Sequence, residues 1–143
     1  MAKPRTVLTF GTYDLFHIGH LRILARASEL GERLVVGVST DELNRFKKGR
    51  YPVYPQRERL EIVRSLRFVD DVFLEESLEQ KREYLLWWRA DVMVMGDDWR
   101  GRMDEFSDIC EVHYLPRTEN ISTTEVESII QARAPAPRLN GGG

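Results

Sequence analysis

The stretch Phe10-Gly11-Thr12-Tyr13-Asp14-Leu15-Phe16-His17-Ile18-Gly19-His20 decides the fold. It follows an apolar, strand-like run, Thr6–Phe10, and leads into a helix-like run. A strand that turns through glycine into a helix leaves backbone N–H groups without intrahelical partners, and these groups favour an anion. We expect His17 and His20 on one side of the first helical turn, with Gly19 leaving room for close approach of a ligand. The stretch predicts a phosphate-binding turn, whereas zinc would need further ligands.

Strand-like and helix-like segments alternate along the chain. Strands are expected at Thr6–Phe10, Arg33–Val38, Phe68–Leu74, Asp91–Met95 and Glu111–Leu115. Helices are expected over Ile18–Leu30, after Ser39, from Pro55, over Leu78–Arg89, and over Ser122–Gln131 with Val126, Ile129 and Ile130 facing inward. This alternation predicts an α/β fold with a parallel sheet, in which ligands lie beyond the carboxyl ends of the strands. The turns after the first, second, fourth and fifth strands should therefore share one edge.

Length and composition limit the class of protein. The 143 residues suit one domain, which we place at residues 1–132, followed by a disordered tail at 133–143. The net charge of −2 offers no basic surplus for nucleic acid, and no apolar run is long enough for a membrane helix. Cys110 is the single cysteine, so no internal disulfide can form. A cytoplasmic location is therefore expected.

Three segments resemble a known enzyme family. His17-Ile18-Gly19-His20 resembles the H-x-G-H signature of the nucleotidyltransferase superfamily, and Gly11–Asp14 resembles its GTFD turn. Met95–Trp99 resembles the G-D-D-W segment of bacterial glycerol-3-phosphate cytidylyltransferases. Arg117–Thr124 resembles the segment that closes their triphosphate site, with Asn120 in place of the usual glycine. The resemblance spans about residues 5–131 and implies a Rossmann-like nucleotidyltransferase fold, with a five-stranded parallel sheet flanked by helices.

The same resemblance implies roles for individual residues. The residues implied as catalytic are His17, His20 and Arg117. Those implied to bind the nucleotide are Gly11, Thr12, Tyr13, His17, His20, Lys48, Gly96, Asp97, Trp99, Arg117, Thr118, Ile121, Ser122, Thr123 and Thr124. Those implied to bind the second substrate are Lys47, Arg59 and Lys81. Taken alone, the hydroxyl residues at 122–124 are ordinary helix caps, and Asp97 to Trp99 is an acidic loop with a surface tryptophan.

A basic cluster follows the second expected strand. Lys47, Lys48 and Arg50 lie in the segment Phe46–Tyr54, whose glycine and proline predict a loop. Three isolated cations are usually a solvated surface. Near a phosphate site, however, they suggest a mobile lid that closes over phosphates. We retain the lid as a hypothesis.

The resemblance implies transfer of CMP from CTP to a phosphorylated small alcohol. Glycerol 3-phosphate is the expected acceptor, with CDP-glycerol and pyrophosphate as products and Mg²⁺ carried on the triphosphate. Phosphocholine, phosphoethanolamine, another polyol phosphate or a phosphonate remain alternative acceptors. An adenylyltransferase using ATP and a nucleotide-binding regulator also remain open. A homodimer is expected, mainly because small members of the family pair, and because one helix face cannot bury both Trp87 and Trp88.

Overall fold

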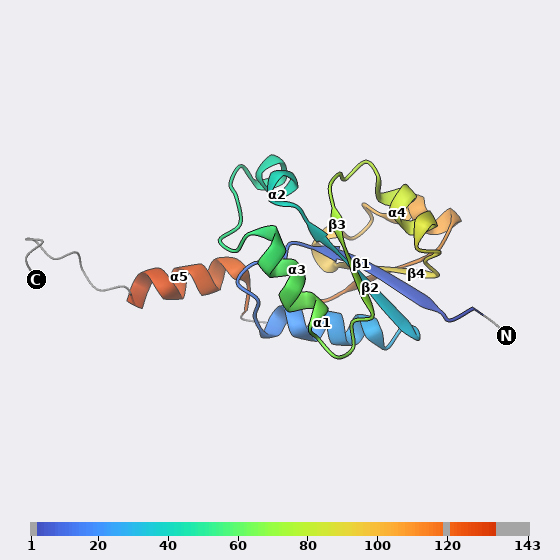
Figure 1. Cartoon of the computed structure of the whole chain (residues 1–143), viewed down its shortest axis with the longest axis horizontal. Coiled ribbons are helices and arrows are strands. Elements are labelled where there is room, and N and C mark those ends of the chain that lie inside the picture. The colour runs from blue at the N-terminus through green and yellow to red at the C-terminus, as the bar shows by residue number, and fades with distance from the viewer. Residues whose placement is uncertain (1–2, 119–120, 134–143) are drawn as a thin grey trace, which may run out of the picture.

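A five-stranded parallel sheet forms the centre of the molecule, as Figure 1 shows. The computed structural model describes residues 3–118 and 121–133. The strands are β1 (Thr6–Gly11), β2 (Arg33–Ser39), β3 (Asp71–Glu75), β4 (Val92–Gly96) and β5 (Glu111–Leu115), in the order β3-β2-β1-β4-β5. Leu8 of β1 pairs with Val35 on one side and Met93 on the other. Because the chain leaves β1 in one direction and returns to its other side at β4, the switch point lies between β1 and β4.

Helices cover both faces of the sheet. The described residues form the helices α1 (Ile18–Ser28), α2 (Asp41–Lys48), α3 (Gln56–Arg64), α4 (Lys81–Trp87) and α5 (Thr123–Arg133), with two short 3₁₀ turns, η1 (Asp97–Trp99) and η2 (Asp104–Asp108). The core against α1 and α3 contains Val7, Leu24 and Val63. The core on the opposite face contains Leu8 and Leu85, with α4 and η2 packed over it. The three layers bury strand residues on both sides, which is typical of a parallel sheet.

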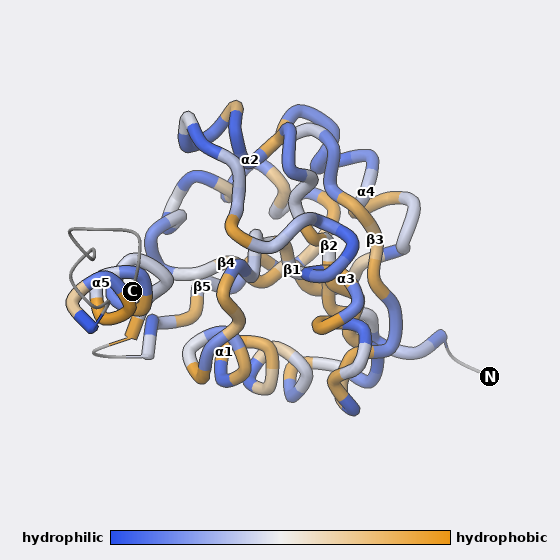
Figure 2. Tube along the Cα trace, turned by 60° about the vertical axis from the view of Figure 1, so that its left-hand side comes forward, coloured by the Kyte–Doolittle hydropathy of each residue, from blue (hydrophilic) through white to orange (hydrophobic). Residues whose placement is uncertain are grey.

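Hydrophobic segments lie on the central strands and on helix α1 below them, as the tube in Figure 2 shows. Val7 and Leu8 are adjacent in β1 and both are fully buried, each in a different face of the core. The parallel sheet predicted from the alternating pattern is confirmed, and β5 has the predicted bounds. Within the described residues, every helix is too short or too polar to cross a bilayer.

Three predicted elements are shorter than expected. The first helix ends at Ser28 rather than Leu30. The third strand begins at Asp71 rather than Phe68, because the preceding residues form a turn in which Val69 N donates to Leu66 O at 3.0 Å. The fourth long helix begins at Lys81 rather than Leu78 and ends at Trp87. Arg89, predicted to be helical, has a φ of 53°. This left-handed conformation turns the chain toward β4.

The predicted loop Phe46–Tyr54 is wrong in its first three residues. Helix α2 continues to Lys48 and ends at Gly49, whose φ of 79° suits a residue without a side chain. Lys47 and Lys48 therefore project from the last turn of a helix. The remaining segment is attached through Asp14, whose carboxylate accepts from Val53 N at 2.7 Å and Tyr54 N at 2.9 Å.

The predicted inward face of the last helix is wrong at two of its three positions, whereas Val126 is half-buried. Ile129 and Ile130 are 50% and 56% exposed, because α5 points away from the sheet and packs on it only near its start (Figure 1). Helix α5 ends at Arg133, one residue beyond the proposed domain boundary. Asn120 and the expected tail after residue 133 lie outside the described residues.

Candidate active site

A cavity of about 400 Å³ opens at the carboxyl edge of the sheet. It brings together segments that are far apart in the sequence, as the parallel fold predicts. The predicted residues on its lining are Gly11, Thr12, Tyr13, His17, His20, Lys47, Lys48, Lys81, Gly96, Trp99, Arg117, Thr118, Ile121, Ser122, Thr123 and Thr124. Two predicted residues, Arg59 and Asp97, are absent from this lining.

The turn from β1 into α1 is held by its two histidines. His17 is the N-cap of α1, and its Nδ1 accepts from Gly19 N at 3.0 Å. His20 reaches back, so that its Nδ1 accepts from His17 N at 3.2 Å. The rings stack with centroids 3.8 Å apart. The histidines thus form a capping box, in which two side chains satisfy backbone N–H groups of the first turn.

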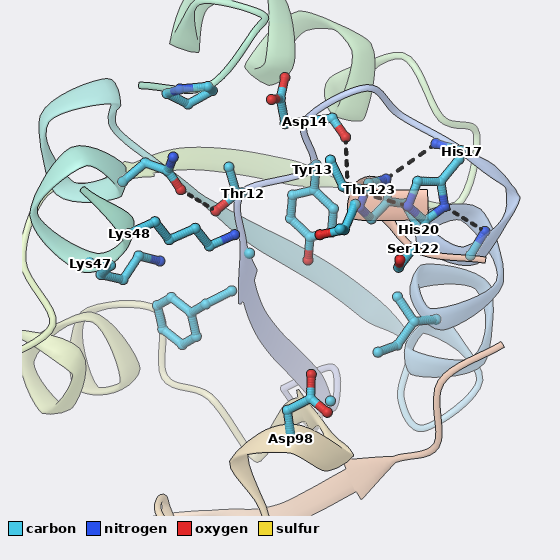
Figure 3. A pocket seen from close by; sticks show the side chains of 18 of the residues that line it. Thr12, Tyr13, Asp14, His17, His20, Lys47, Lys48, Asp98, Ser122 and Thr123 are labelled. Atoms are coloured by element: carbon cyan, nitrogen blue, oxygen red, sulfur yellow. Dashed lines mark hydrogen bonds between the residues drawn. The ribbon is translucent and has the colours of Figure 1, made fainter. Parts of the chain in front are cut away.

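These hydrogen bonds fix the tautomer of both rings. A neutral imidazole whose Nδ1 accepts must carry its proton on Nε2. The Thr123 hydroxyl donates to Asp14 O at 3.2 Å, so its oxygen is free to accept from His17 Nε2 at 3.4 Å. Figure 3 shows these side chains side by side on the cavity wall. Both histidines therefore present Nε2–H donors, and that of His17 already meets a hydroxyl of α5.

Burial keeps both imidazoles neutral. It lowers the pKa of His17, although Glu125 opposes the change. Burial, followed by the charges of His17 and Lys48, lowers the pKa of His20 to about 3. At neutral pH the pair therefore offers hydrogen bonds to phosphate oxygens without carrying positive charge.

Gly19 has a structural role that we did not predict. A Cβ at this position would lie 2.8 Å from a ring atom of His17 and 3.2 Å from Ile121. The space above Gly19 is thus filled by the capping imidazole and by the segment before α5. The missing side chain allows His17 to fold over the helix start, and Gly19 also lines the cavity.

Figure 3 shows three polar groups around the cavity. His17, His20, Ser122 and Thr123 lie on one side, and Lys47 and Lys48 lie opposite them. Asp98 lies at a third position, below Thr12 and Tyr13. We call these the histidine side, the lysine side and the Asp98 side.

The lysine side holds a compact set of charged groups. Lys47 Nζ donates to Ser39 Oγ at 3.1 Å, and the Lys81–Glu75 ion pair lies close by. Burial lowers the pKa of Lys47 to about 8, with the cations Lys81, Lys48 and Arg59 acting in the same direction and Glu75 opposing them. A bound anion would restore the full charge of Lys47.

The Asp98 side corrects one prediction. Asp97 forms a hydrogen bond and ion pair with Arg100 and does not line the cavity, whereas Asp98 lines it and pairs with Arg117. Arg117 is therefore held toward the Gly96–Trp99 turn in this structure. A phosphate that binds Arg117 must compete with Asp98.

Arg59 supports the cavity from below. Its side chain is fully buried, and its guanidinium donates to Thr12 O, Ser39 O and Tyr54 O at 2.8 Å each, and to Asp41 Oδ1 at 2.7 Å. These bonds join three segments of the cavity wall. The structure therefore makes Arg59 a positioning residue, in contrast to the direct substrate contact that we predicted.

Several lining residues were not predicted from the sequence. They include the polar residues Asp14, Asn44, Glu75, Asp98 and Glu127, whereas Arg50 belongs to the basic cluster named from the sequence. Asp14 and Asp98 belong to the quoted Gly11–Asp14 and Met95–Trp99 segments, so a signal existed for both. Asn44 and Glu75 carry none: Asn44 Oδ1 accepts from Thr12 Oγ1 at 3.0 Å across 32 positions of sequence.

Comparison with known proteins agrees with this geometry. The cytidylyltransferase-like family model matches residues 8–129. The chain belongs to the cytidylyltransferase-like family. Relatives in this family include the glycerol-3-phosphate cytidylyltransferases of Bacillus subtilis and Staphylococcus aureus. The former is 48% identical over 127 residues, covering 88% of this chain and 97% of that protein. The latter is 47% identical over 124 residues, covering 86% and 92%.

A solved structure supports the fold of this cytidylyltransferase-like chain. The lipopolysaccharide core biosynthesis protein of Thermoplasma volcanium has a TM-score of 0.73 at 22% identity. The match covers 82% of this chain and all of that one.

Proposed function

We propose that this protein transfers CMP from CTP to glycerol 3-phosphate, giving CDP-glycerol and pyrophosphate. The observation that supports the proposal best is the arrangement of three chemically different groups around one cavity. The names of relatives that align over nearly their whole length support the choice of nucleotide and acceptor.

The arrangement suits an in-line displacement. The histidine side, with the start of α5, offers donors to the departing pyrophosphate, and the lysine side lies opposite, where an attacking phosphate would enter. The backbone turn around Thr12 lies between the two sides. A phosphate monoester is already a nucleophile at neutral pH, so positioning and charge stabilisation supply most of the catalysis. His17 and His20 would donate hydrogen bonds from Nε2–H to phosphate oxygens as negative charge moves to the leaving group.

The Asp98 side suits the nucleoside. Trp99 provides an aromatic surface on the lining, and Asp98 a carboxylate that can accept from an exocyclic amine. Asp98 also holds Arg117. A triphosphate that binds Arg117 would free the Asp98 carboxylate to bind the base. Binding of the phosphates and binding of the base would therefore be coupled.

We propose that Mg²⁺ binds as the CTP complex. Within residues 3–118 and 121–133, no three His, Cys, Asp or Glu side chains gather closely enough to hold a metal ion. Phosphate oxygens and water would therefore provide most of its ligands, as Mg²⁺ prefers. The ion would neutralise part of the triphosphate charge, and the protein side chains would orient the phosphates.

Pyrophosphate release with CTP, ATP, GTP or UTP and glycerol 3-phosphate tests the proposal. We expect turnover with CTP, and larger thermal stabilisation by CTP than by ATP at equal concentration. His17→Asn can still cap α1 but cannot place a donor at Nε2, so kcat should fall about 10²-fold or more. His113→Asn, which lies outside the cavity lining, should leave kcat unchanged. No turnover with CTP, or an unchanged kcat in His17→Asn, would contradict the proposal.

We also propose that two copies of the chain associate. Trp87 is 80% exposed, whereas the neighbouring Trp88 stacks on Phe73, as expected if one helix face cannot bury both. Ile129 and Ile130 add apolar surface on α5. Exposed aromatic and aliphatic side chains of this kind are enriched at interfaces. Light scattering at micromolar concentration should give twice the monomer mass, and the monomer mass would refute the association.

We propose that the reaction takes place in the cytoplasm. Cys110 is the single cysteine of the chain, and a fold that uses no disulfide suits a reducing compartment.

A further inference from the structure

A buried ion pair lies at the lysine side of the cavity. Glu75 is the last residue of β3 and Lys81 is the first residue of α4, with Oε2 and Nζ 2.6 Å apart. The side chains are 1% and 3% exposed, yet both residues contribute to the cavity lining. Removing two charges from water is costly, and a hydrophobic pair of similar volume is often at least as stable. The pair therefore calls for an explanation beyond stability.

We infer that the Glu75–Lys81 pair determines acceptor specificity, so that the enzyme takes a neutral polyol phosphate and rejects the phosphates of cationic amino alcohols. The inference rests on the proposed function, because it concerns the second substrate of that reaction. It gives Glu75 a role in selecting the acceptor. It also gives Lys81 a role in excluding cationic acceptors, in place of direct phosphate binding.

The ammonium group of Lys81 occupies aromatic surface that a cationic acceptor would need. Its Nζ lies 4.3 Å from the centroid of the Phe10 ring and 5.9 Å from that of the Trp99 ring. Aromatic faces of this kind, especially beside a carboxylate such as Glu75, form the usual binding site for quaternary ammonium groups. Here a cation of the protein fills that site. A trimethylammonium group would have to displace it and would meet a like charge.

The free capacity of Glu75 suits a hydroxyl group. Its Oε2 is engaged by Lys81, and its Oε1 lies 3.4 Å from Ser39 Oγ. The Ser39 hydroxyl has a single proton and lies equally far from Gly11 O, so it can serve only one of the two acceptors. Among residues 3–118 and 121–133, Oε1 thus has at most one long, shared hydrogen bond. A hydroxyl of the acceptor alcohol would donate a further hydrogen bond to Oε1.

The charge balance of the lysine side leads to the same conclusion. Lys47, Lys48 and Lys81 carry positive charge and Glu75 carries negative charge, while Arg59 is paired with Asp41. The excess of two cations complements the charge of the acceptor phosphate. A cation on the acceptor would have no counter-charge, because Glu75 is already paired.

The test compares four acceptors at saturating CTP: glycerol 3-phosphate, n-propyl phosphate, phosphoethanolamine and phosphocholine. Pyrophosphate release gives kcat/KM for each. For the wild type we expect kcat/KM with glycerol 3-phosphate to exceed that with each of the other three by about 10²-fold or more. An analogue without the hydroxyl would leave the buried Glu75 Oε1 without a hydrogen-bond donor, and this strongly disfavours it. n-Propyl phosphate tests the hydroxyl contact of Glu75 without any substitution.

Lys81→Ala tests the occupied aromatic site. The substitution empties the space over Phe10 and leaves the Glu75 carboxylate beside it, so the preference for glycerol 3-phosphate over phosphocholine should fall at least tenfold. Arg82→Ala is the matched control: it removes the next cation of α4, which is paired with Asp108 outside the cavity, and should leave the preference unchanged. CTP-dependent thermal stabilisation reports whether each variant is folded.

The outcomes separate the two proposals. No turnover of glycerol 3-phosphate by the wild type refutes the proposed function and the inference with it. Turnover with a preference below about tenfold over any of the three analogues refutes the inference alone. So does a Lys81→Ala enzyme that loses activity in equal proportion with every acceptor. If Lys81→Ala does not fold, Lys81→Ala/Glu75→Gln leaves no buried charge unpaired and must show the same fall in preference.

Discussion

Mild acid is expected to destabilise the protein through His20. Burial, with the nearby charges of His17 and Lys48, lowers the pKa of His20 from 6.5 to about 3. In the unfolded chain the imidazole regains its ordinary pKa. Between about pH 3 and pH 6.5 the unfolded state therefore binds more protons than the folded state. The stability contributed by neutral His20 is complete above pH 6.5 and is lost as the pH falls through this window.

The size of the effect follows from the two pKa values. Between pH 8 and pH 5, a group that shifts from 6.5 to about 3 on folding reduces the free energy of unfolding by about 2 kcal/mol. His20 retains some contact with water at the cavity edge, which weakens the effect to between about 1 and 2 kcal/mol. With a urea dependence of about 2 kcal/mol/M, the midpoint of unfolding should fall by about 0.5–1 M.

Urea unfolding at pH 8, 6.5 and 5 measures this loss. His20→Gln removes the titration but keeps an acceptor at the third helical position, where glutamine can satisfy the N–H of His17. We expect its stability to fall less than that of the wild type between pH 8 and pH 5. The argument fails if the wild type and His20→Gln lose equal stability over this interval.

Three further outcomes are expected. Because burial lowers the pKa of Lys47 to about 8, KM for the acceptor should rise above that pH in the wild type and stay flat to higher pH in Lys47→Arg, as steady-state kinetics would show. Arg59→Leu should cost about 3–5 kcal/mol in urea unfolding because it leaves three carbonyls and the half-buried carboxylate of Asp41 without their donor, whereas the exposed Arg57→Leu should cost less than about 1 kcal/mol. Gly19→Ala should lower both the thermal stability and kcat, because the added Cβ would push the imidazole ring of His17 out of place. A kcat equal to that of the wild type would refute this expectation.

The turn from β1 to α1 was predictable because its chemistry is local. Strand, glycine turn, N-cap and first helical turn all lie within one short stretch, and the capping box joins residues three apart. The edge shared by four turns was predictable too, because parallel strands leave no other placement for their carboxyl ends. These two facts suffice to locate the cavity from the sequence.

The role of Arg59 was not predictable, because its partners are distant in sequence. A charged residue on a helix is normally assigned to the surface or, beside a phosphate site, to the substrate. Here Arg59 follows the inward face with Val63, and its acceptors come from segments near Thr12, Ser39 and Tyr54. Only the folded chain brings these carbonyl groups together.

Two other errors arise from orientation. Asp97 and Asp98 are adjacent in a 3₁₀ turn, so neighbouring side chains point about 120° apart and the sequence cannot say which one faces the cavity. On α5, apolar Ile129 and Ile130 suggested a core-facing side, but the helix leaves the sheet after its first turn. Its apolar residues are consistent with a partner outside the single chain.

The order of the strands accounts for how one cavity can hold two substrates in reacting positions. β1 is central, and its turn into α1 provides the phosphate-binding histidines. β2 and β3 lie on one side and end at Ser39 and Glu75, next to the lysine side. β4 and β5 lie on the other and lead to the Gly96–Trp99 turn and to Arg117. The acceptor and the nucleoside thus approach the central turn from opposite halves of the sheet. The reversal of strand order next to β1 therefore sets the geometry of the proposed transfer.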